Sequence, residues 1–201
     1  MRCETTKFIG AGQRIGKLAA LVIGMLAWVS APSAGTAASL EGGKTVHLVS
    51  RSGEEVAVGT IQFAARDGRT SYTIKIDNPG FSEHFLSMRP FRCLEVAEQT
   101  LCHLPYPHAL RRQVSADDLT DLEYDLLFLH KSTGEYGINF WNGIYYDLAL
   151  APDGTIKGTL KETDMNELAS PPAEKYGRLI RPENLTESDS AKHRFPTLVI
   201  R

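Results

Sequence analysis

The sequence lacks the short motifs by which most enzyme families are identified. It contains no G-x-S-x-G nucleophile motif, no H-E-x-x-H zinc motif and no Walker phosphate-binding loop, and residues 39–201 contain no S-x-x-K. Each of these patterns places a nucleophile, a metal ligand or a set of backbone amides at a fixed spacing. The sequence therefore predicts no catalytic residue.

Long apolar runs are also missing. The most apolar segment, Leu18–Val29, has about 12 residues, whereas a transmembrane helix needs ~20. Basic residues precede this segment and the small-residue run SAPSAGTAAS follows it, which is the order typical of a secretory signal. We therefore expect residues 1–38 to be a cleaved signal peptide, a periplasmic location, and no membrane span after cleavage. An uncleaved N-terminal anchor is the alternative.

An excess of basic charge is absent as well. Residues 1–38 hold four of the 22 Lys and Arg residues and one of the 24 Asp and Glu residues, so residues 39–201 carry a net charge near −5. Nucleic acids and anionic membrane surfaces reward clustered Lys and Arg, so neither is an expected partner. The remaining length suits a single domain, 39–201, with a hydrophobic core of its own.

Cysteine is scarce, and its placement is informative. Of the three cysteines, Cys3 lies in the predicted signal, which leaves Cys93 and Cys102 at C-x8-C spacing. In an oxidising compartment an even pair at short separation predicts a disulfide, which would stabilise the fold by roughly 2.5–3 kcal/mol. Zinc ribbons and redox pairs use C-x2-C instead, so this spacing favours the disulfide. Two free thiols or metal ligands are the alternative.

Two hairpins are predicted from turn residues between alternating strands. Asp67-Gly68 favours a two-residue turn, and pairing outward from it sets Phe63 against Tyr72 and apolar residues against apolar ones. A break in the alternation before Ile61 predicts a β-bulge near Gly59. In the second hairpin a three-residue loop, residues 152–154, sets apolar residues of both strands on one face, with Gly154 as the left-handed residue.

Further runs complete the predicted fold. We expect strands over 45–49, 124–131, 136–141 and 197–200, short helices over 115–122 and 163–168, and an irregular C-terminal section over about 170–194. Six to nine strands at intervals of 8 to 12 residues are typical of an antiparallel architecture. The predicted class is mainly β, a small antiparallel β-barrel or β-sandwich with one or two short helices.

Three histidines cluster around the cysteine pair. His84, His103 and His108 lie within 25 residues, and imidazole nitrogen is a ligand that zinc prefers. However, His103 and His108 are separated by two prolines in HLPYPH, which predicts a rigid extended loop rather than a helix carrying two ligands on one face. A zinc site at these histidines is therefore the alternative, and a structural loop is the main expectation.

Aromatic side chains are concentrated in residues 136–146. Aromatic rings beside amide groups are typical of sites for sugars, peptides and small apolar ligands. The alternative is that these rings fill the core and cover the sheet. The candidate ligand-binding residues are Tyr136, Asn139, Phe140, Trp141, Tyr145 and Tyr146.

Three stretches, FSEHFLSMRPFRCLE, SADDLTDLEYDLLFL and EYGINFWNGIYYDLAL, together resemble an uncharacterised family of small exported proteins of Gram-negative bacteria, of the domain-of-unknown-function type. The resemblance covers roughly residues 80–165. It implies a periplasmic location, and Cys93 and Cys102 match the cysteine pair of that family. It implies no activity, cofactor or catalytic residue.

These observations favour a non-enzymatic module that binds an envelope protein or a small-molecule ligand. The segment around Cys93 and Cys102 and the aromatic segment 136–146 are the expected binding surfaces. One alternative is a metal-dependent or other hydrolase that uses His84, His103 and His108. A further alternative is a structural protein of the cell envelope.

Overall fold

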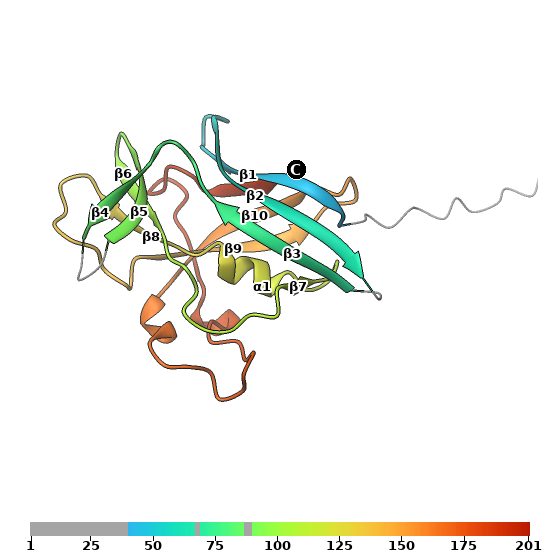
Figure 1. Ribbon diagram of the computed structural model, residues 1–201. Helices are drawn as coiled ribbons and strands as arrows, with labels where there is room; N and C mark the ends of the chain where they lie inside the picture. The colour runs from blue at the N-terminus through green and yellow to red at the C-terminus, as the bar shows by residue number, and fades with distance from the viewer. Residues whose placement is uncertain (1–39, 67–68, 87–89) are drawn as a thin grey trace, which may run out of the picture. The chain divides into compact units, whose positions relative to one another are not determined.

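Twelve strands pair into one antiparallel sheet in the described part of the chain, residues 40–66, 69–86 and 90–201 of a computed structural model (Figure 1). The strands are β1 (Gly42–Val49), β2 (Glu55–Arg66), β3 (Arg69–Ile76), β4 (Phe81–Phe85), β5 (Pro90–Val96), β6 (Gln99–His103), β7 (Gln113–Val114), β8 (Phe128–Ser132), β9 (Gly143–Leu150), β10 (Ile156–Thr163), β11 (Thr186–Glu187) and β12 (Thr197–Ile200). The helices are α1 (Thr120–Asp125) and the 3-10 turns η1 (Met165–Leu168) and η2 (Pro182–Asn184).

The sheet is open. Its strand order is β4-β5-β6-β8-β9-β10-β12-β1-β2-β3-β7, with β11 paired to β10 outside this path. The predicted mainly antiparallel β class with few helices is confirmed, and its finer form is one continuous open sheet rather than a closed barrel. The predicted signal peptide and the Asp67-Gly68 turn lie outside the described residues.

The first hairpin has the predicted register. Phe63 lies opposite Tyr72 and Gln62 opposite Thr73, so apolar side chains of β2 and β3 share the buried face. The predicted bulge is confirmed as well, because the pairing of β1 with β2 shifts between Val46 and His47, opposite Gly59. Gly59 fits there because a Cβ at this position would lie 2.5 Å from a backbone oxygen of β3.

The second hairpin also follows the prediction. Leu150 pairs with Ile156, and the loop closes through a hydrogen bond from the Ala151 N–H to the Thr155 carbonyl of 2.8 Å. Gly154 adopts φ 80°, the left-handed conformation that the three-residue loop requires. Turn chemistry and side-chain alternation therefore sufficed to set the register of both hairpins.

Two segments differ from the prediction. The helix begins at Thr120 rather than Ser115, because Ser115 and Asp118 form a short β-bridge instead of a helical turn. The predicted strand over 124–131 is correspondingly shorter, since β8 begins only at Phe128. Residues 136–141 form no strand, and Gly137 at φ 78° is incompatible with an extended strand at that point.

The predicted short helix over 163–168 is confirmed as η1, whereas the section 170–194 is irregular apart from η2 and β11.

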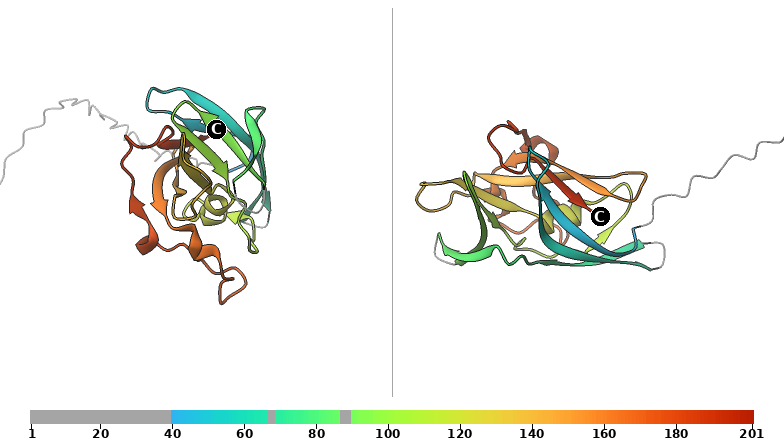
Figure 2. Two further views of the ribbon diagram at one scale, coloured as in Figure 1. Left: turned by 90° about the vertical axis from the view of Figure 1, so that its left-hand side faces the viewer. Right: turned by 90° about the horizontal axis from the view of Figure 1, so that it is seen from above.

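Two hydrophobic cores lie on opposite faces of the sheet. Along β9, Tyr146 belongs to the first core, which includes residues of β1, β2, β3 and β12, while Tyr145 belongs to the second. The second core joins side chains of β5, β6 and β8 to Met165, Leu168 and Ile180 of the C-terminal segment. Figure 2 shows this segment, in orange, along one side of the strands. The C-terminal segment therefore covers the face of the sheet that carries the cysteines.

Cys93 and Cys102 lie directly opposite each other on β5 and β6. Their sulfur atoms are at bonding distance, 2.06 Å, and both side chains are fully buried in the second core. A disulfide at this position joins two neighbouring strands, so it also limits separation of the sheet at this end.

We expect the double variant Cys93→Ala/Cys102→Ala to lose about 2–4 kcal/mol of unfolding free energy, because the unfolded chain is no longer constrained. Urea unfolding measures the loss, and fully reduced wild-type protein should show a similar one. The buried sulfurs should also resist a thiol reagent until the oxidised protein is both denatured and reduced. Two thiols labelled in the native protein would contradict the disulfide.

Candidate functional site

An apolar groove lies where three distant parts of the chain meet. The proline segment after β6, the aromatic segment 136–146 and η1 all contribute side chains to its wall. The groove encloses about 330 Å³ and is lined by Leu104, Pro105, Pro107, Phe140, Met165, Asn166, Leu168 and Ala169. Of the two surfaces predicted from sequence, the aromatic segment contributes Phe140 to this groove, whereas no residue between Cys93 and Cys102 lines it.

The proline segment is held at both ends. The Leu104 N–H donates to the Leu127 carbonyl at 2.9 Å, and His108 Nε2 donates to the Leu168 carbonyl at 2.9 Å. Between these contacts the Tyr106 ring stacks on the Tyr124 ring, with centroids 4.7 Å apart. Prolines restrict φ and remove backbone donors, so the segment between the two ends has little conformational freedom. The wall of the groove is therefore preformed.

The opposite wall is built on η1. The Asp164 side chain accepts the Asn166 N–H at 2.9 Å and caps the turn, while the Met165 N–H donates to the Phe140 carbonyl at 2.8 Å. Gly143 allows this arrangement, because a Cβ there would lie 2.4 Å from the Thr163 carbonyl oxygen and 2.6 Å from the Met165 side chain. Only glycine lets the start of β9 approach η1 so closely.

A smaller cavity of about 150 Å³ adjoins the groove. It is lined by Pro90, Phe91, Arg92, His103 and Pro105, and Pro105 also lines the groove. The two cavities thus share Pro105, and Arg92, which also lines the smaller one, is ion-paired with Asp77 at 3.2 Å.

The predicted aromatic ligand residues separate into three environments. Tyr145 and Tyr146 are buried on opposite faces of β9, and the Tyr146 hydroxyl donates to the Phe195 carbonyl at 2.8 Å. Tyr136 and Trp141 are exposed, at 105% and 65% of their reference areas. Asn139 is exposed as well, Phe140 is half-buried, and of the predicted set only Phe140 lines the groove.

The three predicted metal-binding histidines have separate partners. His84 Nε2 lies 2.8 Å from the Ser82 hydroxyl, and His103 Nε2 donates to the Asp125 carbonyl at 3.1 Å. His108 is bound to η1, as described above. Within residues 40–66, 69–86 and 90–201, no group of three or more His, Cys, Asp or Glu side chains is placed to hold a metal ion. This part of the chain therefore offers no three-ligand site for the zinc ion of the alternative hypothesis.

Sequence reasoning missed two buried carboxylates on α1. Glu123 Oε1 accepts the Leu148 N–H at 2.9 Å, and its other oxygen accepts the Tyr145 hydroxyl. Burial raises the pKa of the Glu123 carboxyl, while these two hydrogen bonds act in the opposite direction. Glu123 also lines a cavity of about 350 Å³ together with the exposed Asp147. Both Glu123 oxygens are already hydrogen-bonded, so the carboxylate holds α1 against β9.

Asp125 ties α1 to the other side of the fold. Its side chain accepts the Tyr72 hydroxyl at 2.9 Å and the Arg112 Nε–H at 3.1 Å. Burial, followed by the Asp125 charge, raises the pKa of the Tyr72 hydroxyl. Residues 115–125 hold five acidic side chains, and the interleaved Leu119 and Leu122, like the following Leu126, are buried. That helical spacing of leucines was the available signal that part of this run faces inward.

A histidine pair far apart in sequence was also missed. The His130 and His193 rings meet edge to face, with centroids 4.7 Å apart, and His193 Nε2 lies 2.7 Å from Glu162 Oε1. The Arg194 N–H donates to Gln99 Oε1, which leaves the Gln99 amide to donate to His193 Nδ1 at 3.2 Å. This series of hydrogen bonds places the ring N–H of His193 on Nε2, toward Glu162. Burial, with the neighbouring His193, lowers the pKa of His130 to about 4.

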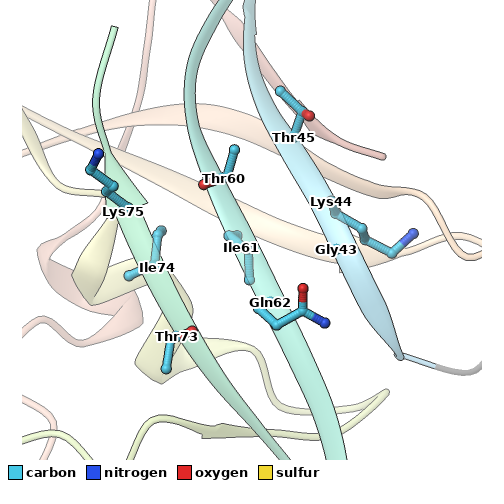
Figure 3. A pocket seen from close by; sticks show the side chains of 9 residues that line it. All are labelled: Gly43, Lys44, Thr45, Thr60, Ile61, Gln62, Thr73, Ile74 and Lys75. Carbon is cyan, nitrogen blue, oxygen red and sulfur yellow. The ribbon is translucent and has the colours of Figure 1, made fainter.

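A polar hollow lies on the outward face of β1, β2 and β3. It encloses about 460 Å³, and Figure 3 shows its side chains standing in rows along three strands rather than converging on a point. The two amines at its ends point apart, and Lys75 is paired with Asp77 at 2.7 Å. The hollow is lined by Gly43, Lys44, Thr45, Thr60, Ile61, Gln62, Thr73, Ile74 and Lys75. These features describe a solvated sheet face.

Comparison with known proteins gives no relatives. No protein-family model, curated protein or solved structure matches the chain. In the described residues, no helix combines the length and apolar character needed to cross a membrane. The function of the groove is therefore inferred from its geometry alone.

Removal of the Glu123 side chain should destabilise the fold. We expect Glu123→Ala to cost about 1–3 kcal/mol, because the Tyr145 hydroxyl and the Leu148 N–H lose their acceptors in a buried site. Asp147→Ala is the matched control, since this exposed carboxylate lines the same cavity and should change stability by less than about 0.5 kcal/mol. Urea unfolding compares both with the wild type. Equal losses in the two variants would contradict the assignment.

The lowered pKa of His130 predicts a pH dependence of stability. The unfolded chain takes up a proton at this residue near pH 6.5, whereas the folded chain does so only near pH 4. The contribution of His130 to the free energy of unfolding is therefore fully present above pH 6.5 and is lost as the pH falls toward 4. In urea titrations across this interval, His130→Gln should show a shallower decline than the wild type. Parallel curves would show that His130 does not contribute.

Proposed function

We propose that this chain is a non-enzymatic binding module of the bacterial periplasm, and that its apolar groove binds the apolar part of a small ligand or of an envelope protein. The observation that carries the proposal is the groove itself, formed where the proline segment, Phe140 and η1 meet. The location rests on the predicted signal peptide and agrees with a disulfide between Cys93 and Cys102.

The size and lining of the groove support this function. A volume of about 330 Å³ lies at the lower end of the range for small-molecule sites, which are predominantly apolar with few polar groups. Asn166 is the one lining residue with a polar side chain, and its amide contacts Asp164 at 2.7 Å. The groove therefore suits an aromatic ring or a branched aliphatic group rather than a charged ligand.

Preorganisation of the groove supports binding as well. The contacts of Leu104 and His108 fix one wall, and the Met165 N–H contact with Phe140 fixes the other. A site that is already ordered loses little conformational entropy when a ligand enters.

The hydrolase alternative gains no comparable support. His84, His103 and His108 each contact a different group, and the buried Glu123 has both oxygens occupied by hydrogen bonds. We therefore advance the binding module as the single proposed function.

A fluorescence titration with the neutral, apolar probe N-phenyl-1-naphthylamine tests the proposal. We expect the folded protein to bind the probe, and Ala169→Trp to weaken binding at least about tenfold by filling the groove from its exposed rim. Phe140→Ala should weaken binding too, by removing one wall. Tyr136→Ala is the matched control, because Tyr136 lies in the same segment but is fully exposed.

Backbone amide shifts locate the bound probe. The largest changes should fall on residues 104–108 and 165–169 on the two sides of the groove. Unchanged affinity in Ala169→Trp, or shifts confined to other regions, would overturn the assignment of the site.

A further inference from the structure

One end of the sheet terminates in a strand that is paired on one side only. β4 is the last strand in the sheet order, and in the described part of the chain it pairs only with β5 (Figure 1). The disulfide between Cys93 and Cys102 joins β5 to β6, so the strand beneath this edge is fixed covalently to the rest of the sheet. The strand that carries this edge is therefore held in the sheet by a covalently linked neighbour.

The pairing phase shows which backbone groups face outward. The Cα atoms of Cys93 and Cys102 are only 3.9 Å apart, which is typical of a non-hydrogen-bonded antiparallel pair. The N–H and C=O of Cys93 must then point toward β4, to its partner Ser82. Because direction alternates along a strand, the N–H and C=O groups of Glu83 and Phe85 point away from β5, toward the open side.

At the opposite end of the sheet, the first part of β3 is covered. At β3, strand β7 pairs with Thr70 and Ser71, and the Arg112 carbonyl accepts the Tyr72 N–H at 3.1 Å. β3 also carries Lys75, and lysine is common on protected edges. β4 has no lysine or proline, and its Phe85 is 76% exposed. An exposed edge of this kind is a typical place for strand addition.

Charge at the edge defines the partner. Glu83 is exposed, and its cross-strand neighbour Arg92 pairs instead with Asp77 at 3.2 Å. Within the described residues no ion pair is formed by Glu83. Phe85 lies two residues further on the same face of the strand, so the edge presents a carboxylate followed by an apolar ring. An incoming strand complements this surface with a basic residue and an apolar residue at alternate positions.

We propose that the open edge of β4 binds an extended, basic segment of another protein by β-strand addition. The segment forms backbone hydrogen bonds with Glu83 and Phe85 and places a Lys or Arg beside the Glu83 carboxylate. A second copy of this chain fits less well, because a symmetric antiparallel pairing centred on Glu83 sets two carboxylates opposite each other. This site is separate from the groove, so it does not depend on the proposed function.

Titration of the full chain with a synthetic peptide tests the inference. The probe is an acetylated, amidated eight-residue peptide in which Lys and Val alternate, and the control is the same peptide with Glu in place of Lys. We expect the Lys peptide to shift the amide signals of Glu83 and Phe85 and to slow their hydrogen exchange at least about tenfold. The Glu peptide should bind about threefold to tenfold more weakly.

Variants separate charge recognition from backbone pairing. Glu83→Lys is an exposed substitution that should reverse the preference between the two peptides. A Lys peptide methylated at alternate backbone nitrogens should not bind, because it cannot donate to the edge. Ala169→Trp, which fills the groove, should leave peptide binding unchanged.

Four results of the peptide experiments overturn the inference. They are absence of binding at millimolar peptide, affinity indifferent to Glu83→Lys, binding that survives backbone methylation, and binding abolished by Ala169→Trp, which would place the peptide in the groove. Protection of the same amides in the free protein, with a dimer mass by analytical ultracentrifugation, would instead assign the edge to a second copy and also reject the proposal.

Discussion

The hydrogen bonds accepted by the α1 carboxylates are the contacts on which most of the structure depends. Glu123 holds α1 to β9, and Asp125 holds it to Tyr72 of β3. Tyr124, between them, points into the second core, where its hydroxyl both donates to the Ile180 carbonyl and accepts the Ile180 N–H. The same ring supports Tyr106 by stacking. A six-residue helix thus positions the C-terminal segment and the proline segment together.

The groove and the β4 edge differ in the interaction they offer. The groove offers apolar side chains within a fixed wall, so recognition there depends on shape and burial. The edge offers backbone donors and acceptors with one carboxylate, so it suits the extended backbone of a partner more than any particular side chain. Both are attached to the part of the sheet that contains Cys93 and Cys102, which gives this pair a role in holding two surfaces as well as in stability.

Local patterns predicted local structure well. The registers of both hairpins, the bulge near Gly59 and the left-handed Gly154 all follow from alternation and turn chemistry, which act over a few residues. The predictions were wrong where several local signals competed. The helix predicted over 115–122 begins instead at Thr120, and Gly137 breaks the strand predicted over 136–141. The groove is assembled from residues 104–107, 140 and 165–169, and the His130–His193 contact spans two distant segments. No local sequence pattern specifies such long-range contacts, because they form only through tertiary packing.

Gly143 has a consequence for how the groove can change over evolution. It does not line the groove, yet any side chain there would collide with the Thr163 carbonyl and with Met165, which does. Enlarging this one residue would push η1 outward and deepen or distort the groove without changing any residue of its wall. The shape of the groove therefore depends on a backbone position beneath it. Substitution at that position would reshape the groove while the identity of every wall residue stayed the same.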